Sequence, residues 1–356
     1  MPLHWGAAPK WLFERMVRLC RAVTDIVVTD YGPDELLRRF SDPVWFQSFG
    51  CVLGFDWHSS GVTTTVCGAL KEAVKGREAE LGLFVCGGKG AASRKTPAEI
   101  TGHSDSFGLD GDRLVRASRL SAKVDSAALQ DGYQIYHHVF IGTGEGAWAV
   151  VQQGMNTDTR WARRYHWLSE GLEDFTREPH KGIACDHSAE PLNMVAAEVD
   201  AARQAVVELS AHAPDVTVKQ LERLRALGMP AQHPVGLGDV SPRYLQKALV
   251  QTYEQPPADF SALLLQPGVG PKTIRALALI AEVTYGAPLS FRDPVTYSFA
   301  VGGKDGYPYP VDRSAYDRSV AFLEKGIREA KLGNRDRLDA LRRLERWSVH
   351  TAGTRR

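Results

Sequence analysis

The β-forming residues of this 356-residue chain are concentrated in its first half. Up to about residue 185, short runs rich in valine, isoleucine and aromatic residues alternate with glycine-containing turns. From about residue 190 onward such runs nearly vanish, and apolar residues recur at helical spacing in PLNMVAAEVDAARQAVVEL and SPRYLQKALVQTYE. The sequence therefore predicts an α+β fold, with a mixed α/β domain over residues 1–185 and an all-helical domain over residues 190–350.

Three apolar segments define the strands expected in the N-terminal domain. CVLGFDW (51–57) and LGLFVC (81–86) each precede a turn and a helical pattern, which predicts two strand-loop-helix units. The second helix is expected to begin at the TPAE of Thr96–Glu99, which has the form of a capping box. The segment YQIYHHVFIGTGEGAWAVVQQG (133–154) places two β-rich runs around glycines and predicts a hairpin, so the sheet is expected to be mixed.

Composition argues against several classes of protein. The net charge of +1 makes any nucleic-acid surface a local one. Five cysteines without a C-x-x-C pair fit a reducing compartment and argue against a disulfide framework, a zinc site or an iron–sulfur cluster. No run approaches the roughly 18 apolar residues of a membrane span, and the N-terminus lacks the pattern of a signal peptide. We expect a cytoplasmic protein with no membrane partner, of undetermined oligomeric state.

The run PPADFSALLLQPGVGPKTIRALALIAEVTYG resembles a helix-hairpin-helix element over residues 258–286. Gly268 and Gly270 permit a turn tight enough for the backbone N–H groups at the start of the second helix to point outward together. With Lys272 and Thr273, these donors form an anion site suited to a DNA backbone phosphate. The resemblance implies DNA as the partner, bound largely through phosphates and not base edges. The alternative is an ordinary helical hairpin with a glycine turn.

Residues 258–320 also resemble the helix-hairpin-helix DNA glycosylases. In members that cleave the abasic site a lysine follows this turn, and an aspartate comes later in a Val-Asp context. Lys272 matches the lysine and Asp312 in PVDRSAYDRSV matches the acid, although forty positions separate them, about twice the family spacing. Asp293 has about the right spacing but the wrong context, and no cysteine follows position 185 to hold the family's iron–sulfur cluster. Lys272 is therefore either a nucleophile or a phosphate contact.

Polar residues in the N-terminal half form candidate catalytic clusters. One contains Asp56 and His58, which alternate at the end of an expected strand and share one face. The other candidates are Lys123, Asp125, Asp131, His137 and His138. Asp125 and Asp131 would suit Mg²⁺ or Mn²⁺ for phosphodiester hydrolysis, with a histidine or lysine handling the proton. A substrate pocket without metal, or satisfied polar residues at sheet ends, would account for the same pattern.

A glycine-rich loop supplies a second candidate for phosphate contact. CGGKGAASRKTP (86–97) follows an expected strand and precedes an expected helix, so Lys89, Arg94 and Lys95 with nearby N–H groups suit a phosphate. It lacks the Walker pattern G-x-x-x-x-G-K-[ST]. A solvated loop is the alternative interpretation.

Motifs along nearly the whole chain, including HWGAAPKWL, GFDWHSSGVTT, GGKGAASRKTP, KVDSAALQDGYQIYHH and GGKDGYPYPVDR, resemble the domain-of-unknown-function family 763 of archaea and bacteria. That resemblance brings no activity with it. The residues themselves favour a DNA-processing hydrolase of repair type acting on the phosphodiester backbone. A helix-hairpin-helix glycosylase or glycosylase/lyase and a non-catalytic DNA-binding protein are the alternatives, so whether the protein is an enzyme stays open.

Overall fold

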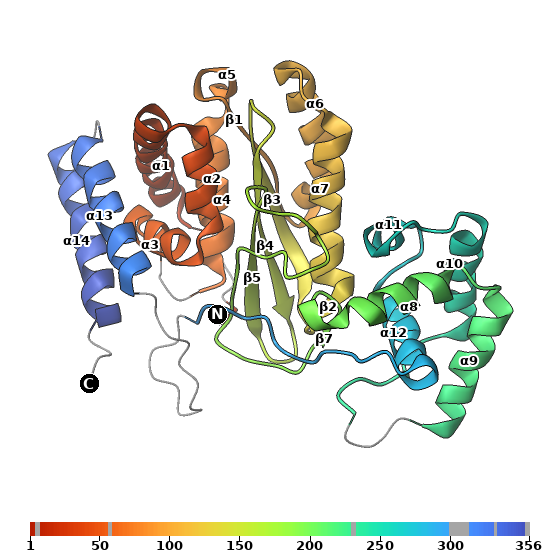
Figure 1. The fold of residues 1–356 in the computed structure, drawn as a ribbon. Helices are drawn as coiled ribbons and strands as arrows, with labels where there is room; N and C mark the ends of the chain where they lie inside the picture. Colours follow the sequence, from red (N-terminus) through yellow and green to blue (C-terminus); the bar gives the residue numbers. More distant parts are fainter. Residues whose placement is uncertain (4–7, 56–58, 229–232, 299–312, 331–332, 353–356) are drawn as a thin grey trace.

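A five-stranded antiparallel sheet lies between two layers of helices (Figure 1). The computed structural model describes residues 1–3, 8–55, 59–228, 233–298, 313–330 and 333–352. The fold is α+β, which confirms the class predicted from the sequence. Within the described residues, no helix is long and apolar enough to span a membrane. All five cysteines are buried, and none of them is in a disulfide.

The sheet has the strand order β1-β3-β4-β5-β6, and every neighbouring pair is antiparallel. Its strands are β1 (Leu83–Lys89), β3 (Gln134–Thr143), β4 (Trp148–Asn156), β5 (Trp161–Leu168) and β6 (Gly182–Ala184). The hairpin predicted within 133–154 is confirmed as β3 and β4, joined through Gly146 at a positive φ of 81°. A small second sheet pairs β2 (Leu129–Gln130) with β7 (Leu192–Asn193).

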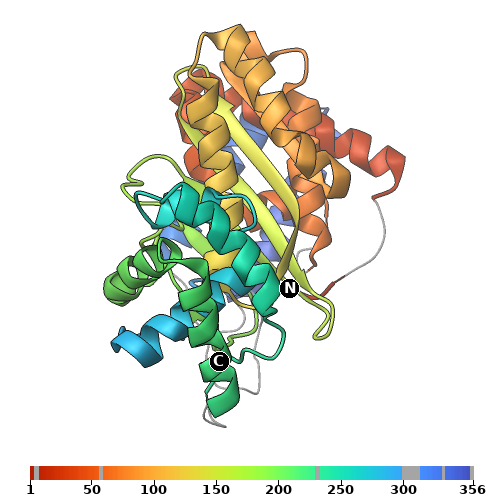
Figure 2. The ribbon, with the colours of Figure 1, turned by 90° about the vertical axis from the view of Figure 1, so that its right-hand side faces the viewer.

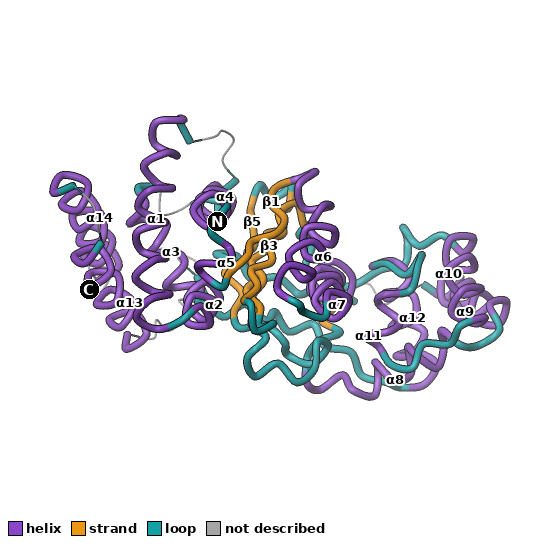
Figure 3. The backbone as a smooth tube through the Cα atoms, turned by 90° about the horizontal axis from the view of Figure 1, so that it is seen from above, coloured by secondary structure: helices purple, strands orange, loops and turns teal. Residues whose placement is uncertain are grey.

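One face of the sheet packs against N-terminal and C-terminal helices together (Figure 3). These helices are α1 (Lys10–Tyr31), α2 (Pro33–Ser41), α3 (Pro43–Leu53), α4 (Gly61–Val74), α13 (Arg313–Glu329) and α14 (Asn334–Ala352). A short helix, α5 (Glu78–Leu81), leads into β1. Leu323 of α13 and Leu344 of α14 belong to the same apolar core as Phe49 of α3 and Val139 of β3. The last two helices therefore complete the layer that the first four begin, while a domain division near 185–190 stays a prediction.

The other face carries α6 (Thr96–Phe107) and α7 (Gly111–Lys123), and α7 continues into a π-helical turn, Val124–Ala128. Beyond them lie the helices expected from the C-terminal pattern, which Figure 2 shows in green to light blue beside one end of the sheet. They are α8 (Asp200–Ser210), α9 (Pro214–Leu227), α10 (Pro242–Glu254), α11 (Phe260–Leu265) and α12 (Pro271–Tyr285). A continuous apolar core joins this group to the sheet, with Phe140 and Trp167 at one end and Leu277 at the other.

The strand predicted over residues 51–57 is wrong. Residues 51–53 are the last turn of α3, which ends at Gly54 in the left-handed conformation with φ 98°. Every residue of α3 is buried, so its sequence shows no one-sided helical periodicity. A short apolar run of this kind does not distinguish a strand from a buried helix. The expected pair of strand-loop-helix units is thus reduced to one, and the described sheet is antiparallel, not mixed.

The capping box predicted at Thr96–Glu99 is also wrong. The helix α6 begins at Thr96 itself after Lys95, which makes no side-chain cap. Glu99 instead accepts a hydrogen bond from the Gly87 amide at 2.7 Å and pairs with Lys71 of α4 at 2.7 Å. Its carboxylate therefore links α6 to β1 and α4 and leaves the start of its own helix uncapped.

The contact between Gly142 and Phe84 yields a stability prediction. A Cβ added at Gly142 would lie 2.2 Å from the buried Phe84 ring, so Gly142→Ala forces a core rearrangement. We expect it to lower the free energy of unfolding by about 1–3 kcal/mol in urea denaturation. The control is Gly102→Ala on α6, where a Cβ meets nothing within 4 Å and helix propensity favours alanine. Equal stability of the two variants would contradict this packing.

Candidate functional site

The turn between α11 and α12 is held in a conformation that requires glycine at one position. Asp259 caps α11 by accepting from the Ala262 amide at 2.6 Å. Gly268 has a positive φ of 79°, and a Cβ there would approach Ala248 of α10 at 3.7 Å. Val269 is buried below the turn. The two helices flanking Gly-Val-Gly lie where the sequence predicts them.

Two side chains from the sheet half anchor this turn by its carbonyl groups. The ammonium of Lys123, the last residue of α7, donates to the Val269 carbonyl at 2.7 Å. The amide of Gln130 donates to the Pro271 carbonyl at 2.8 Å. Burial lowers the pKa of Lys123. Lys123, a candidate catalytic residue in the sequence, thus lies where it fixes the turn.

The first turn of α12 presents backbone donors without a side-chain cap. Gly270 is the N-cap residue and makes no side-chain cap bond. Pro271 has no N–H, and the first helical hydrogen bond runs from the Ile274 amide to the Gly270 carbonyl at 3.0 Å. The amides of Lys272 and Thr273 therefore have no acceptor within the helix. They lie at the positive end of the helix dipole, where an anion is stabilised.

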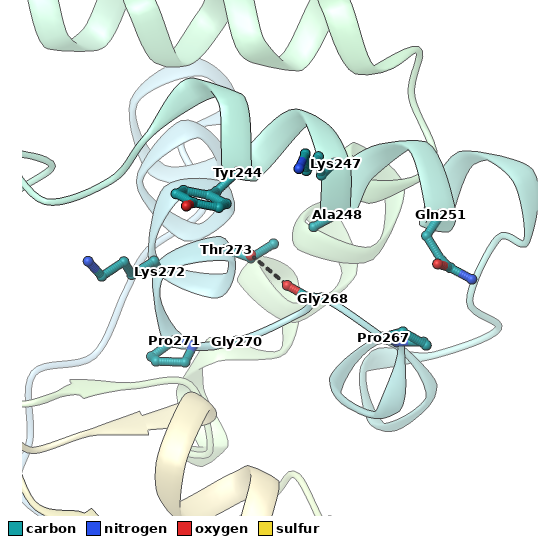
Figure 4. Close-up of a pocket in the computed structure, with 10 residues that line it drawn as sticks. All are labelled: Tyr244, Lys247, Ala248, Gln251, Pro267, Gly268, Gly270, Pro271, Lys272 and Thr273. Carbon is teal, nitrogen blue, oxygen red and sulfur yellow. Dashed lines mark hydrogen bonds between the residues drawn. The ribbon is translucent and has the colours of Figure 1, made fainter.

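A pocket of about 530 Å³ opens at this helix start (Figure 4). Its wall on one side is the turn with Lys272 and Thr273, and on the other α10 with Tyr244, Lys247 and Ala248. Tyr244 is 73% exposed, and Lys247 is exposed beside it. A Cβ at Gly270 would meet nothing within 4 Å, so this glycine leaves open space for a ligand and not for protein packing.

Asp239 is the acidic partner of Lys272 in this pocket. Lys272 is 59% exposed, and its ammonium lies 3.4 Å from an Asp239 carboxylate oxygen and donates to the Asp239 carbonyl at 3.0 Å. Arg275 pairs with the same carboxylate at 2.9 Å. Partial burial works to raise the pKa of Asp239, but Arg275 and Lys272 together hold it below its ordinary value. An incoming anion would compete with this carboxylate for Lys272.

The carboxylates predicted to hold a metal are buried and fully engaged by protein donors. Asp125 accepts from Trp167 Nε1 at 2.9 Å, from His180 at 2.5 Å and from Gln152. Asp131 accepts from Arg163 at 3.0 Å and from the Tyr165 hydroxyl at 2.6 Å. Burial raises the pKa of Asp131 despite the Arg163 charge.

These environments do not fit a Mg²⁺ or Mn²⁺ ion. Over the described ranges, no group of three or more histidine, cysteine, aspartate or glutamate side chains is arranged to hold a metal ion. The donors around Asp125 and Asp131 also occupy the oxygens that a metal would need.

The two neighbouring histidines of β3 face opposite sides of the sheet. His138 bonds Ser118 of α7 at 2.9 Å and Gln152 of β4 at 2.7 Å, and burial lowers its pKa. His137 is 1% exposed, and neither ring nitrogen has a hydrogen-bond partner within the described structure. Burial, assisted by His138 and Lys89, lowers the pKa of His137 to about 3. Neither ring reaches the surface in this conformation.

The remaining predicted site residues lie apart from the pocket. Lys89, Arg94 and Lys95 are exposed around the 3₁₀ turn Gly90–Lys95, and none of them lines the α12 pocket. Their role in phosphate contact stays a prediction. Asp56, His58 and Asp312 lie outside the described residues.

Sequence reasoning missed Tyr244, Lys247 and Asp239. The only available signal was the spacing of Tyr244 and Lys247, which places both on one face of a helix. That spacing is equally typical of a solvated face. The closeness of α10 to the glycine turn depends on tertiary packing against Gly268, which no local pattern encodes.

These features define an α+β protein with an antiparallel sheet between helical layers and a polar pocket at the start of α12. The chain belongs to the family described as "Protein of unknown function (DUF763)", which it matches over residues 1–311. Neither the curated proteins nor the solved structures contain a significant match to it.

The Lys123 anchor can be tested with Lys123→Met, which keeps the apolar stem and removes the ammonium. The Val269 carbonyl then loses a charged donor, so we expect the free energy of unfolding to fall by about 1–3 kcal/mol. Hydrogen exchange of the amides in residues 266–273 should become faster. Lys219→Met on α9, at an exposed position, is the matched control. Unchanged exchange in the turn would show that Lys123 does not hold it.

His137 predicts a specific pH dependence of stability. The pKa of His137 is lower in the folded than in the unfolded protein, so low pH protonates the unfolded chain first. The stability that its neutral ring provides is therefore complete above about pH 6.5 and is lost as the pH falls toward 3. His137→Leu should therefore remove about 2 kcal/mol of the stability loss between pH 6.5 and pH 5. Urea unfolding at several pH values measures it, with the exposed His212→Leu as control. An unchanged slope for His137→Leu would contradict the buried, unpartnered environment.

Proposed function

We propose that the protein binds DNA through backbone phosphates, with α11, the Gly-Val-Gly turn and α12 acting as a helix-hairpin-helix element. The observation that carries this proposal is the open pocket at the uncapped start of α12, which Lys247, Lys272 and Thr273 line. A phosphate in this pocket would accept from the Lys272 and Thr273 amides and meet two ammonium groups. Such contacts position a duplex without reading its sequence.

The surroundings of the pocket support a binding role because they pre-form it. Lys123 and Gln130 donate hydrogen bonds to the Val269 and Pro271 carbonyls, so the turn does not need to reorganise to present its amides. Open space at Gly270 lets a sugar-phosphate backbone approach the helix start closely. Asp239 holds Lys272 beside the pocket until phosphate replaces it.

The same contacts favour a phosphate contact over a nucleophile for Lys272. A Schiff-base mechanism requires a lysine nitrogen that is free to attack the sugar, whereas that of Lys272 donates to the Asp239 carbonyl at 3.0 Å and lies 3.4 Å from its carboxylate. The glycosylase proposal also needs Asp312, which lies outside the described residues. The repair-type hydrolase stays a proposal without a described catalytic centre, since Asp125, Asp131 and His138 are buried. Binding is therefore the function that the described residues support best.

Fluorescence anisotropy with a labelled DNA duplex tests this proposal. Lys247→Ala and Lys272→Ala should each weaken binding of every duplex sequence alike. Each should also make the slope of log K against log salt shallower by about one, since one phosphate contact is lost. Gly270→Ala should weaken binding while leaving the melting temperature close to that of the wild type, because its methyl group enters ligand space.

The matched control is Lys181→Ala, which removes one exposed positive charge before β6. It should lower affinity far less than the pocket variants. If all four variants bind alike, or if the wild-type protein does not bind duplex DNA at low salt, the proposal fails. Incubation of the duplex with Mg²⁺ or Mn²⁺ would additionally reveal backbone cleavage, which binding alone does not produce.

A further inference from the structure

A second open recess lies on the opposite side of the sheet from the α12 pocket. It is a groove of about 900 Å³ between α1 and α4. Figures 1 and 3 place these two helices on one side of the sheet and α10 and α12 on the other. Among the residues lining the groove are Trp11, Phe13, Arg15, Arg18, Arg21 and Lys71.

Three arginines of this groove form no ion pair within the described residues, although Arg21 donates to the Glu72 carbonyl at 3.5 Å and its charge helps to lower the pKa of Glu80. Arg15, Arg18 and Arg21 are exposed and recur every third residue along α1, spanning about 9 Å of helix axis. In the described part of the chain none of them forms an ion pair. Other arginines of this layer do form such pairs, since Arg38 reaches Glu170 and Arg77 reaches Asp25, each at 2.7 Å.

The acidic residues near the groove only partly offset these charges. Lys71 is held by Glu99 at 2.7 Å, and Glu72, which lines the groove, lies 3.7 Å from Lys75. Glu14 is the remaining carboxylate of the lining. The arginine row therefore keeps an excess of positive charge, which favours an anionic ligand.

The groove also exposes an aromatic ring that protein packing does not use. Trp11 is 61% exposed, and the Arg15 guanidinium lies 5.7 Å from its ring centroid. Phe13 is partly buried next to Gly68 of α4, where a Cβ would lie 3.7 Å from the Phe13 ring. An exposed indole with a guanidinium beside it forms a surface on which an unpaired base can stack.

We propose that the groove between α1 and α4 binds a single-stranded segment of nucleic acid. The three arginines contact successive phosphates, and Trp11 stacks on a base. A row of cations with an exposed aromatic ring is the combination that binds single strands without sequence preference. A duplex keeps its bases stacked inside and cannot use Trp11 in this way. The inference is independent of the α12 pocket, because the two sites share no residue.

The test measures anisotropy of a labelled oligothymidine and of a labelled duplex against the full chain and its variants. Trp11→Ala should weaken oligothymidine binding by about fivefold or more, the effect of losing one stacked base. Trp11→Phe should retain most of the wild-type affinity for oligothymidine. Arg18→Ala should weaken binding and make its salt dependence shallower. Because Trp11 and Arg18 are exposed, the melting temperatures of the Trp11 and Arg18 variants should match that of the wild type.

The controls separate this inference from the function proposed above. Arg116→Ala removes an exposed arginine of α7 and should leave oligothymidine binding unchanged. Lys247→Ala should weaken duplex binding and not oligothymidine binding. Wild-type oligothymidine affinity in Trp11→Ala and Arg18→Ala would overturn the inference. So would equal losses for duplex and single strand, or competition by ATP as effective as that by unlabelled oligothymidine.

Discussion

The structure depends on keeping one buried carboxylate satisfied. Asp125 lies in the π-helical turn after α7 and accepts hydrogen bonds from Gln152 of β4, Trp167 of β5 and His180. A buried carboxylate without such donors would cost several kcal/mol. These three donors therefore fix the turn against the sheet. Lys123 just before it and Gln130 just after it are the two residues that hold the α11–α12 turn. The irregular helix turn therefore connects sheet and pocket by polar contacts, in addition to the apolar core that they share.

The polar residues of the sheet gather at one end of it and on both faces. Lys89, His137, Gln153 and Arg164 form one row across the strands, and His138, Gln152 and Tyr165 form the adjacent row on the opposite face. The other end is apolar, with Phe84, Phe140 and Trp148 packed together. Lys89 is exposed, and the buried members are hydrogen-bonded within the protein apart from His137, whose ring nitrogens have no partner among the described residues. The histidine, amide and carboxylate groups that suggested a catalytic site, such as His138, Gln152 and Asp125, are engaged in hydrogen bonds within the fold.

Sequence patterns predicted the parts of the fold that are encoded locally. Alternation around glycines located the β3–β4 hairpin, and periodicity with Gly268 located α11 and α12. The end of α3 was assigned wrongly because a helix buried on all sides has no polar face to reveal its period. Of the candidate site, only the turn around Gly268 and Gly270 was predictable from the sequence. Lys123 resembled a catalytic residue because nothing within its own helix indicates a carbonyl acceptor 146 residues away.

The return of α13 and α14 to the first layer has a consequence for how the chain folds. Leu344 and Ala340 of α14 cover α3, about 290 positions earlier in the sequence. Such distant contacts are slow to form because a long loop must close before they contribute. During synthesis on the ribosome, the apolar surface of α3 therefore stays partly uncovered until α14 emerges. The N-terminal helices come first in the sequence, yet their core is completed only when α13 and α14 pack against it.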